Sequence, residues 1–162
     1  MTANLFDANF YRSSNSDLAK LTDSQALAHY QNFGIKEGRL GSPFLDLKFY
    51  RASNSDLAAL SDQDLFNHAQ NFGVKEGRKL SPFVDLDFYL NSNADLKQAF
   101  GNNKEQALAH LQTYGLQENR RFSQFVNLDY YLGVNKDVDK AFNSDRAKTL
   151  QHLETFGIKE NS

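Results

Sequence analysis

Residues 44–82 read FLDLKFYRASNSDLAALSDQDLFNHAQNFGVKEGRKLSP, and this stretch decides the fold because close variants of it occur four times. Its tyrosine recurs with successive spacings of 39, 39 and 42 residues, at Tyr11, Tyr50, Tyr89 and Tyr131. Periods of roughly 20–50 residues are typical of repeat proteins, in which one unit cannot bury its apolar face alone. The sequence therefore predicts four segments, about 5–43, 44–82, 83–124 and 125–162, stacked into one contiguous array that forms a single domain over residues 1–162.

Other residues recur at fixed positions in these segments. An Asn and an Asp follow each tyrosine by four and six residues, and further on come a histidine and an aromatic–Gly pair. The histidines are His29, His68, His110 and His152, and the glycines are Gly34, Gly73, Gly115 and Gly157. Each histidine precedes the next tyrosine by 21 residues, but the Asp–His separation is 12 in the first two segments and 15 in the last two. Three residues are close to one helical turn, so we expect a lengthened helix end or loop near residues 100–103 and 142–144.

The stretch that carries each histidine has the clearest helical pattern. In the first segment Thr22 and Gln25 form a capping-box pattern. Gly34 suits the left-handed position after a helix, with Ile35 folding back on the last turn. We expect Ser61 to cap the equivalent second helix, and caps near Asn103 and Ser144 in the third and fourth. The Phe and Tyr residues, including Phe33 on this stripe, are expected to lie almost entirely in the core.

Two shorter helices are expected before it in each segment. Residues 85–90 have a broad apolar face and predict the first, and residues 95–100 predict the second. An Asn-x-Asp step separates them: its Asn is expected to tolerate the left-handed conformation, and Ser, Asn or Asp can cap the next turn. Alternating strand patterns are missing from the sequence. The predicted fold class is all-α, with about three short helices in each of four tandem segments.

Composition narrows the functional classes. Hydrophobic residues make up 40% of the chain and include 14 Phe and 7 Tyr, enough to build a core. A net charge of −2 with interleaved signs offers no basic face for nucleic acid. The sequence contains no apolar run long enough to span a membrane. It contains no cysteine, which excludes disulfides and thiolate metal sites.

Residues 44–50 (FLDLKFY) and 72–83 (FGVKEGRKLSPF) carry a resemblance to a known class of repeat. The chain resembles, from residue 5 to 161, helical repeats of cyanobacterial and other bacterial secreted and surface proteins, including RTX-like type I secretion substrates, S-layer-like proteins and adhesins. It departs from that pattern at Gln124, which replaces Pro, and at Asn119 and Asn161, which replace Gly. Asn is the next best residue for a left-handed turn, so the turn is expected to survive.

The resemblance implies an extracellular or cell-surface location, reached by type I secretion without an N-terminal signal peptide. The first residues indeed lack a basic segment followed by an apolar one. The chain stops inside a segment that elsewhere leads into another repeat. We therefore expect the N-terminal module of a longer protein, with a small protein that ends abruptly as the other interpretation.

The repeated polar residues invite a metal interpretation, which the spacing does not favour. The histidines lie one per segment, whereas zinc ligands converge on one point. We expect each ring to have a structural role, bonded to a neighbouring backbone group. The Asn-x-Asp steps lack calcium-binding loop patterns and are explained by capping and turn formation. No cofactor and no metal are expected.

The Glu-Gly-Arg segments are the best candidates for a repeated binding surface. Their arginines could bind carboxylate or phosphate groups of a glycan, or could form solvated ion pairs or ion pairs between neighbouring segments. The candidate ligand-binding residues are Arg39, Arg78, Arg120, Lys36 and Lys75.

The sequence contains no catalytic motif of a hydrolase, a P-loop enzyme or a zinc protease, and we expect no enzyme. The preferred hypothesis is a non-enzymatic cell-surface or S-layer-like module for envelope anchoring or assembly. Its expected partners are envelope polysaccharide or lipopolysaccharide, or other copies of the surface protein. The alternative is an intracellular helical scaffold that binds a protein, in the manner of other helical repeat arrays.

Overall fold

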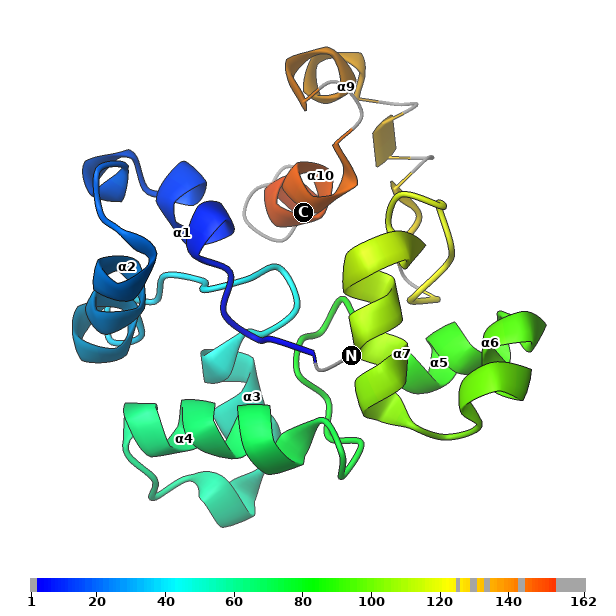
Figure 1. Ribbon diagram of the computed structural model, residues 1–162, viewed down its shortest axis with the longest axis horizontal. Helices are drawn as coiled ribbons and strands as arrows, with labels where there is room; N and C mark the ends of the chain where they lie inside the picture. Colours follow the sequence, from blue (N-terminus) through cyan, green and yellow to red (C-terminus); the bar gives the residue numbers. More distant parts are fainter. Residues whose placement is uncertain (1–2, 125, 129–130, 133–134, 143–144, 154–162) are drawn as a thin grey trace. The chain divides into compact units, whose positions relative to one another are not determined.

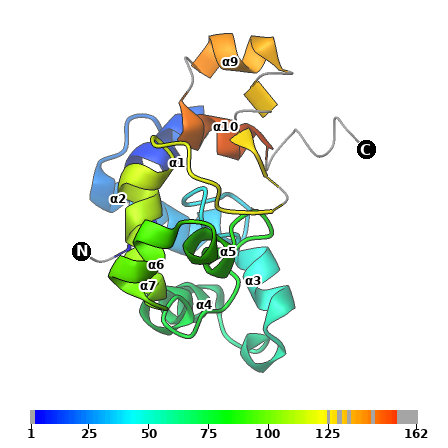
Figure 2. The ribbon, with the colours of Figure 1, turned by 90° about the vertical axis from the view of Figure 1, so that its right-hand side faces the viewer.

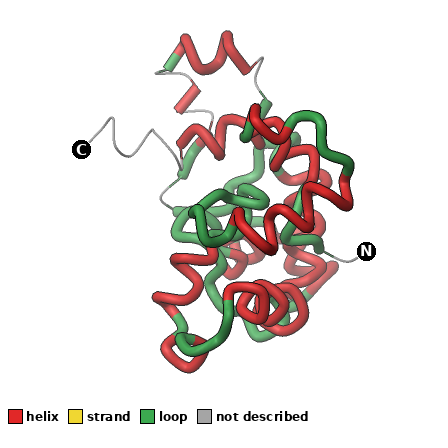
Figure 3. The backbone as a smooth tube through the Cα atoms, turned by 90° about the vertical axis from the view of Figure 1, so that its left-hand side faces the viewer, coloured by secondary structure: helices red, strands yellow, loops and turns green. Residues whose placement is uncertain are grey.

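A computed structural model of the chain describes residues 3–124, 126–128, 131–132, 135–142 and 145–153 (Figure 1). Within these ranges helices are joined by loops and no strand occurs, as Figure 3 shows. The predicted all-α class is confirmed. The chain divides into two compact units, an N-terminal unit of Asn4–Pro82 and a C-terminal unit of Phe83–Ser162 together with Met1–Ala3.

The N-terminal unit contains the same four elements twice. In the first segment these are α1 (Ala8–Ser14), the 3₁₀ turn η1 (Ser16–Leu18), α2 (Asp23–His29) and the π-helical turn η2 (Tyr30–Gly34). In the second they are α3 (Leu47–Ser53), η3 (Ser55–Leu57), α4 (Asp62–His68) and η4 (Ala69–Gly73). The helices α1 and α2 pack together, and so do α3 and α4 (Figure 1).

The C-terminal unit begins with a longer version of this arrangement. Its elements are α5 (Leu86–Asn91), α6 (Ala94–Phe100), α7 (Lys104–His110) and the π-helical turn η5 (Leu111–Gly115), followed by α9 (Lys136–Phe142) and α10 (Arg146–His152) (Figure 2). The helix α5 packs against α7, and α9 against α10. The short helix predicted at residues 95–100 is confirmed as α6.

Side-chain caps explain where the helices begin. Asp7, Asp46 and Asp85 each accept a hydrogen bond from the backbone N–H three residues later, at 3.0, 3.1 and 3.0 Å. The capping box of Thr22 with Gln25 is confirmed, and so are the predicted caps at Ser61 and Asn103. Asp145 caps α10, whereas Ser144 lies outside the described residues.

The histidine-bearing helices end one turn later than the sequence suggested. Gly34 and Gly73 lie inside π-helical turns, and neither they nor Gly115 have a positive φ. The left-handed positions are Gly38 (φ 75°), Gly77 (φ 72°) and, as expected from its Asn, Asn119 (φ 59°). The N–H of Arg39 donates to the carbonyl of Gly34 at 2.9 Å, and that of Gly38 to Ile35 at 3.1 Å. These two bonds make a Schellman ending at Gly38, so its assignment to Gly34 was wrong.

A close approach explains why the earlier glycines are needed. A Cβ at Gly34, Gly73 or Gly115 would lie 2.1–2.2 Å from the hydroxyl of Tyr11, Tyr50 or Tyr89, respectively. No side chain fits there. These glycines therefore serve tertiary packing and not helix termination, and Gly157 lies outside the described residues.

The four recurring tyrosines are equivalent in burial. Tyr11, Tyr50 and Tyr89 are 0% exposed and Tyr131 is 6% exposed, which confirms the prediction of equivalent buried positions.

In each of the first three segments a backbone hydrogen bond joins the beginning of the segment to its end. The N–H groups of Asp7, Asp46 and Asp85 donate to the carbonyls of Gly41, Leu80 and Phe122 at 2.9, 2.9 and 3.0 Å.

Within the N-terminal unit the two segments are also joined to each other. The rings of Tyr30 and Phe66 meet edge to face with centroids 5.6 Å apart. The N–H of Leu5 donates to the side-chain carbonyl of Gln70 at 2.8 Å. These contacts position both π-helical turns, because Tyr30 begins the first and Gln70 lies in the second.

Candidate functional site

Each recurring tyrosine is hydrogen-bonded to the recurring histidine of its own segment. The Tyr Oη to His Nδ1 distances are 2.9 Å for Tyr11–His29, 3.0 Å for Tyr50–His68, 2.8 Å for Tyr89–His110 and 2.7 Å for Tyr131–His152. The structural role expected for the histidines fits this geometry. The expected bond from the ring to a backbone group was wrong at His29, His68 and His110, where the partner is a tyrosine hydroxyl from an earlier helix of the segment.

Burial favours the neutral form of these tyrosines. It raises the pKa of Tyr50 to about 12 and also raises the pKa of Tyr11 and Tyr89. A neutral hydroxyl can donate to Nδ1 or accept from it, according to the tautomer of the ring. In either case the pair fixes the position of each imidazole.

The arginine of each Glu-Gly-Arg segment is held by three side chains of its own segment, an arrangement we name the arginine clasp. In the first segment Arg39 Nε donates to Glu37 at 3.1 Å. Its Nη1 donates to Asn15 and to Asp17, both at 3.0 Å, and its Nη2 donates to Asp17 at 3.1 Å. The Arg–Asp pair is therefore bidentate, which is the strongest geometry for this kind of ion pair.

The clasp recurs with little change in the next two segments. Arg78 bonds Asn54 at 2.8 Å and Asp56 at 2.9 and 2.8 Å, with Glu76 at 2.6 Å. Arg120 bonds Asn93 at 3.0 Å and Asp95 at 2.9 and 2.8 Å, with Glu118 at 2.5 Å. These hydrogen bonds lower the pKa of all three carboxyl groups below the usual Asp value, at Asp17, Asp56 and Asp95.

The clasp makes the three arginines less accessible than the predicted ligand-binding surface requires. Arg39, Arg78 and Arg120 are only 25%, 24% and 23% exposed, and their donors serve carboxylates of the same chain. Of the ion pairs that the sequence left as the other interpretation, the structure has solvated ones within a segment, with the Asp side chains 58–60% exposed. For these three arginines the expected pairing between neighbouring segments was wrong, because the recurring Asp of the same segment reaches the guanidinium. A ligand anion would have to compete with that bidentate carboxylate. The predicted Lys36 and Lys75 lie on the surface one turn before these arginines.

The Asn of each clasp connects it to the tyrosine. Its side-chain NH₂ donates back to the tyrosine carbonyl at 2.8 Å for Asn15 and Asn54 and at 2.7 Å for Asn93. In the fourth segment Asn135 makes the same bond to the carbonyl of Tyr131 at 2.8 Å. The backbone at Asn15 is extended, with φ −136° and ψ 90°. The left-handed conformation that the sequence allowed for this Asn is not adopted, because the extended backbone lets one amide both cap the helix and bind the arginine.

Three aromatic residues stand out on the surface. Phe33, Phe72 and Tyr114 are 58%, 56% and 50% exposed, and among the described residues they are the large hydrophobic side chains that lie in solvent. Each directly precedes the recurring glycine. Each ring contacts the histidine four residues earlier, with centroids 5.5, 5.5 and 5.4 Å apart.

The expectation that the aromatic residues lie almost entirely in the core was wrong at these positions. The buried stripe follows steps of four residues, through Ala26, Tyr30 and Gly34, and not steps of three. Helical periodicity is compatible with both steps. Phe33 lies about 100° around the helix from Gly34, which turns its ring outward.

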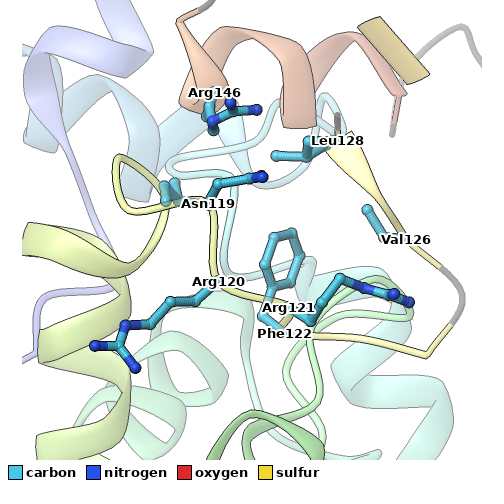
Figure 4. Close-up of a pocket in the computed structure, with 8 residues that line it drawn as sticks. Asn119, Arg120, Arg121, Phe122, Val126, Leu128 and Arg146 are labelled. Atoms are coloured by element: carbon cyan, nitrogen blue, oxygen red, sulfur yellow. The ribbon is translucent and has the colours of Figure 1, made fainter. Parts of the chain in front are cut away.

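A shallow pocket in the C-terminal unit is a weaker candidate site (Figure 4). Figure 4 shows apolar side chains and arginines around it, and its lining consists of Leu116, Asn119, Arg120, Arg121, Phe122, Val126, Leu128 and Arg146. Its centre has room for about one water molecule. A sugar or a nucleotide would not fit without rearrangement.

Two features are absent from the described ranges. Within them, no three His, Cys, Asp or Glu side chains converge to hold a metal ion. No helix in the part of the chain that the structure describes is long and apolar enough to cross a membrane.

Sequence reasoning missed the exposed aromatics and the Asn and Asp partners of the arginines. A signal for the clasp was present, because each Asp precedes its arginine by 22 residues in the first two segments and by 25 in the third. That difference equals the three-residue insertion. Comparisons of the chain with protein-family models, with curated proteins and with solved structures found no significant match.

Proposed function

We propose that this chain is a non-enzymatic module of a bacterial cell-surface protein, which anchors or assembles that protein by binding polysaccharide or lipopolysaccharide of the envelope. The observation that carries this proposal is the exposed aromatic residue at one register of three segments. Each of these rings contacts the histidine of a Tyr–His pair, and each of the three segments also contains an arginine clasp.

The repeated Tyr–His pair and arginine clasp support a repeat protein with a repeated outer surface. In such a protein each segment presents one weak contact, and the number of segments sets the total affinity. A polymer with a repeated chemical unit is the ligand that this arrangement suits. We propose that all four segments are structural repeats of one array, with the fourth resembling the third.

The recurring polar side chains are hydrogen-bonded to one another within the protein, and this supports a binding role and not catalysis. The recurring histidines are bonded through Nδ1 to buried tyrosines, and the recurring Asp and Glu side chains are bonded to arginine. A general acid or base needs a group that is poised to exchange protons with a substrate. An extracellular location is part of this proposal and is supported by the resemblance to secreted repeats.

Retention of the purified chain on isolated bacterial envelopes tests this function. Before mixing, one batch of envelopes is treated with protease and another with periodate, which cleaves sugars that carry neighbouring hydroxyl groups. We expect retention to survive protease treatment and to be lost after periodate treatment.

Two results would contradict this expectation. Loss of retention after protease treatment would point to a protein partner, such as another copy of the surface protein. A lack of retention on untreated envelopes would overturn the proposed function. A chain unfolded in urea and washed under the same conditions controls for nonspecific adsorption.

A further inference from the structure

Building on the proposed function, we propose that Phe33, Phe72 and Tyr114 are stacking platforms that each take the apolar face of one sugar ring of the envelope polysaccharide. Single exposed hydrophobic residues are common on protein surfaces and need no explanation. Here the exposure recurs at one register, at 50–58%, while the equivalent neighbours in the stripe are buried. Recurrence of this kind indicates a shared role.

Each platform is held in a fixed orientation. The ring of Phe33 leans on His29 at an interplanar angle of 48°, Phe72 on His68 at 47°, and Tyr114 on His110 at 50°. Each of these histidines is tied in turn to a buried tyrosine hydroxyl. A ring that is already ordered loses little conformational freedom when a ligand stacks on it, so binding is less costly.

The surroundings of the rings favour a sugar over a protein surface. Asn32 and Lys36 are exposed beside Phe33, and Asn71 and Lys75 are exposed beside Phe72. The core of a protein interface needs a contiguous apolar patch, which these polar neighbours interrupt. A pyranose offers one small apolar face edged by hydroxyl groups, and that pattern matches a single ring edged by amide and ammonium groups.

The electrostatics of an aromatic ring suit the same ligand. The face of the ring carries partial negative charge, and the C–H groups on the apolar face of a sugar carry partial positive charge. Stacked nucleic-acid bases would also fit a ring, but single-strand binding needs a positively charged groove. The net charge of −2 disfavours that occupant.

Position 114 indicates which property of the side chain matters. Tyr114 occupies the position of Phe33 and Phe72, keeps the contact with histidine and keeps half of its surface exposed. The aromatic ring is therefore retained while a hydroxyl is accepted at its outer end. A stacking role requires the ring, whereas a role of filling space over the histidine could be met by leucine.

The test compares two triple variants of the whole chain. In the first, Phe33→Leu, Phe72→Leu and Tyr114→Leu remove the rings and keep apolar side chains over the histidines. In the second, Phe33→Tyr, Phe72→Tyr and Tyr114→Phe keep every ring. With polysaccharide extracted from the envelopes as the probe, we expect the leucine variant to bind at least tenfold more weakly, and the ring-preserving variant to bind within twofold of the parent chain.

A second measurement keeps the proposal testable if the leucine variant does not fold. Titration of the parent chain, ¹³C-labelled in its aromatic residues, with the same polysaccharide should shift the ring signals of Phe33, Phe72 and Tyr114 and leave those of buried Tyr50 unchanged. Unchanged ring signals with a parent chain that binds, or equal binding of a folded leucine variant, would overturn the platforms and leave the proposed function standing. A parent chain that binds no envelope polysaccharide would overturn both.

Discussion

The first and third segments build the same internal contacts from different lengths of chain. In the first, the 3₁₀ turn Ser16–Leu18 follows the clasp Asn, whereas in the third the α-helix Ala94–Phe100 takes its place. The Tyr–His distance is nevertheless 2.9 Å in one and 2.8 Å in the other. The Arg–Asp bonds differ by no more than 0.3 Å, at 3.0 and 3.1 Å against 2.9 and 2.8 Å.

This comparison shows which part of a segment can vary. The insertion lies between the clasp Asp and the histidine, so it lengthens the connection and leaves both ends of the network in place. Gly101, with φ 61° and ψ −118°, ends the longer helix and returns the chain to Asn103, which caps α7. The conserved contacts define the segment, and the helix between them does not.

The ion pair between the tyrosine-bearing helix and the histidine-bearing helix also differs between the segments. Arg12 on α1 pairs with Asp23 on α2 at 2.7 Å, and Arg51 on α3 pairs with Asp62 on α4 at 2.9 Å. In the third segment the acidic partner, Asp87, lies on the first helix and pairs with Lys104 at 2.5 Å. The signs are exchanged while the attraction remains, so the pairing of the two helices matters more than which of them carries the positive charge.

The largest expected effect tests whether short and long segments share one close contact. Gly34→Ala and Gly115→Ala should each lower the free energy of unfolding by about 3 kcal/mol, because the new Cβ would meet a fully buried tyrosine hydroxyl. Urea unfolding of each variant measures this. Gly38→Ala is the matched control, since nothing lies within 4 Å of its Cβ position and only its positive φ should cost about 1 kcal/mol. A Gly115→Ala loss no larger than that of the control would show that the long segment packs differently.

Replacement by Asn should lower the stability by different amounts at two turn glycines, Gly77 and Gly101. Gly77 (φ 72°) occupies the position at which the third segment uses Asn119. Gly77→Asn should therefore cost less than about 1 kcal/mol. Gly101→Asn should cost about 2 kcal/mol, because its ψ of −118° with a positive φ lies outside the left-handed helical region that Asn tolerates. Equal losses in thermal unfolding would contradict this distinction.

The Tyr–His pair should make stability depend on alkaline pH. Because burial raises the folded pKa of Tyr50 to about 12 from its ordinary 10.0, the stabilisation is complete below pH 10 and is lost as pH rises toward 12. Tyr50→Phe should cost about 1 kcal/mol at pH 7 through the lost hydrogen bond and should flatten the alkaline limb of a pH–stability curve. Tyr89→Phe should do the same in the longer segment. An unchanged alkaline limb in both variants would contradict a buried neutral tyrosine.

The smallest expected effect concerns the exposed side of the clasp. The pKa of Asp17, Asp56 and Asp95 is lowered by their arginines from the ordinary 3.8. Their contribution is therefore present above pH 3.8 and is lost as pH falls through the lower folded values. Replacing all three Asp by Asn should shift the midpoint of acid unfolding only slightly upward, and less in high salt. A large shift that is insensitive to salt would show that the clasp is more buried than the structure has it.

Local sequence chemistry was sufficient for much of the fold. The helices, the capping box at Thr22, the cap at Ser61 and the equivalence of the tyrosines all follow from residues that act within a few positions of one another or recur at a fixed period. The three-residue insertion near residues 100–103 was also located correctly, although the sequence left a lengthened helix end and a longer loop as alternatives. The structure has the helix, Ala94–Phe100. The insertion expected near 142–144 falls on residues 143 and 144, which lie outside the described residues.

The candidate site depended on contacts that no local pattern contains. Whether Phe33 faces the core or the solvent depends on steps of three or four residues along one helix, and its sequence fits both. The stripe is set by Tyr11, which comes from another helix and leaves room only for Gly34. The arginine partners likewise lie 22 to 25 residues away. The sequence by itself determined the all-helical segments, their caps and their period, because those interactions are short-range; only the tertiary structure decided where the helices end, which rings are exposed and what the arginines bind, because those depend on side chains brought together by folding.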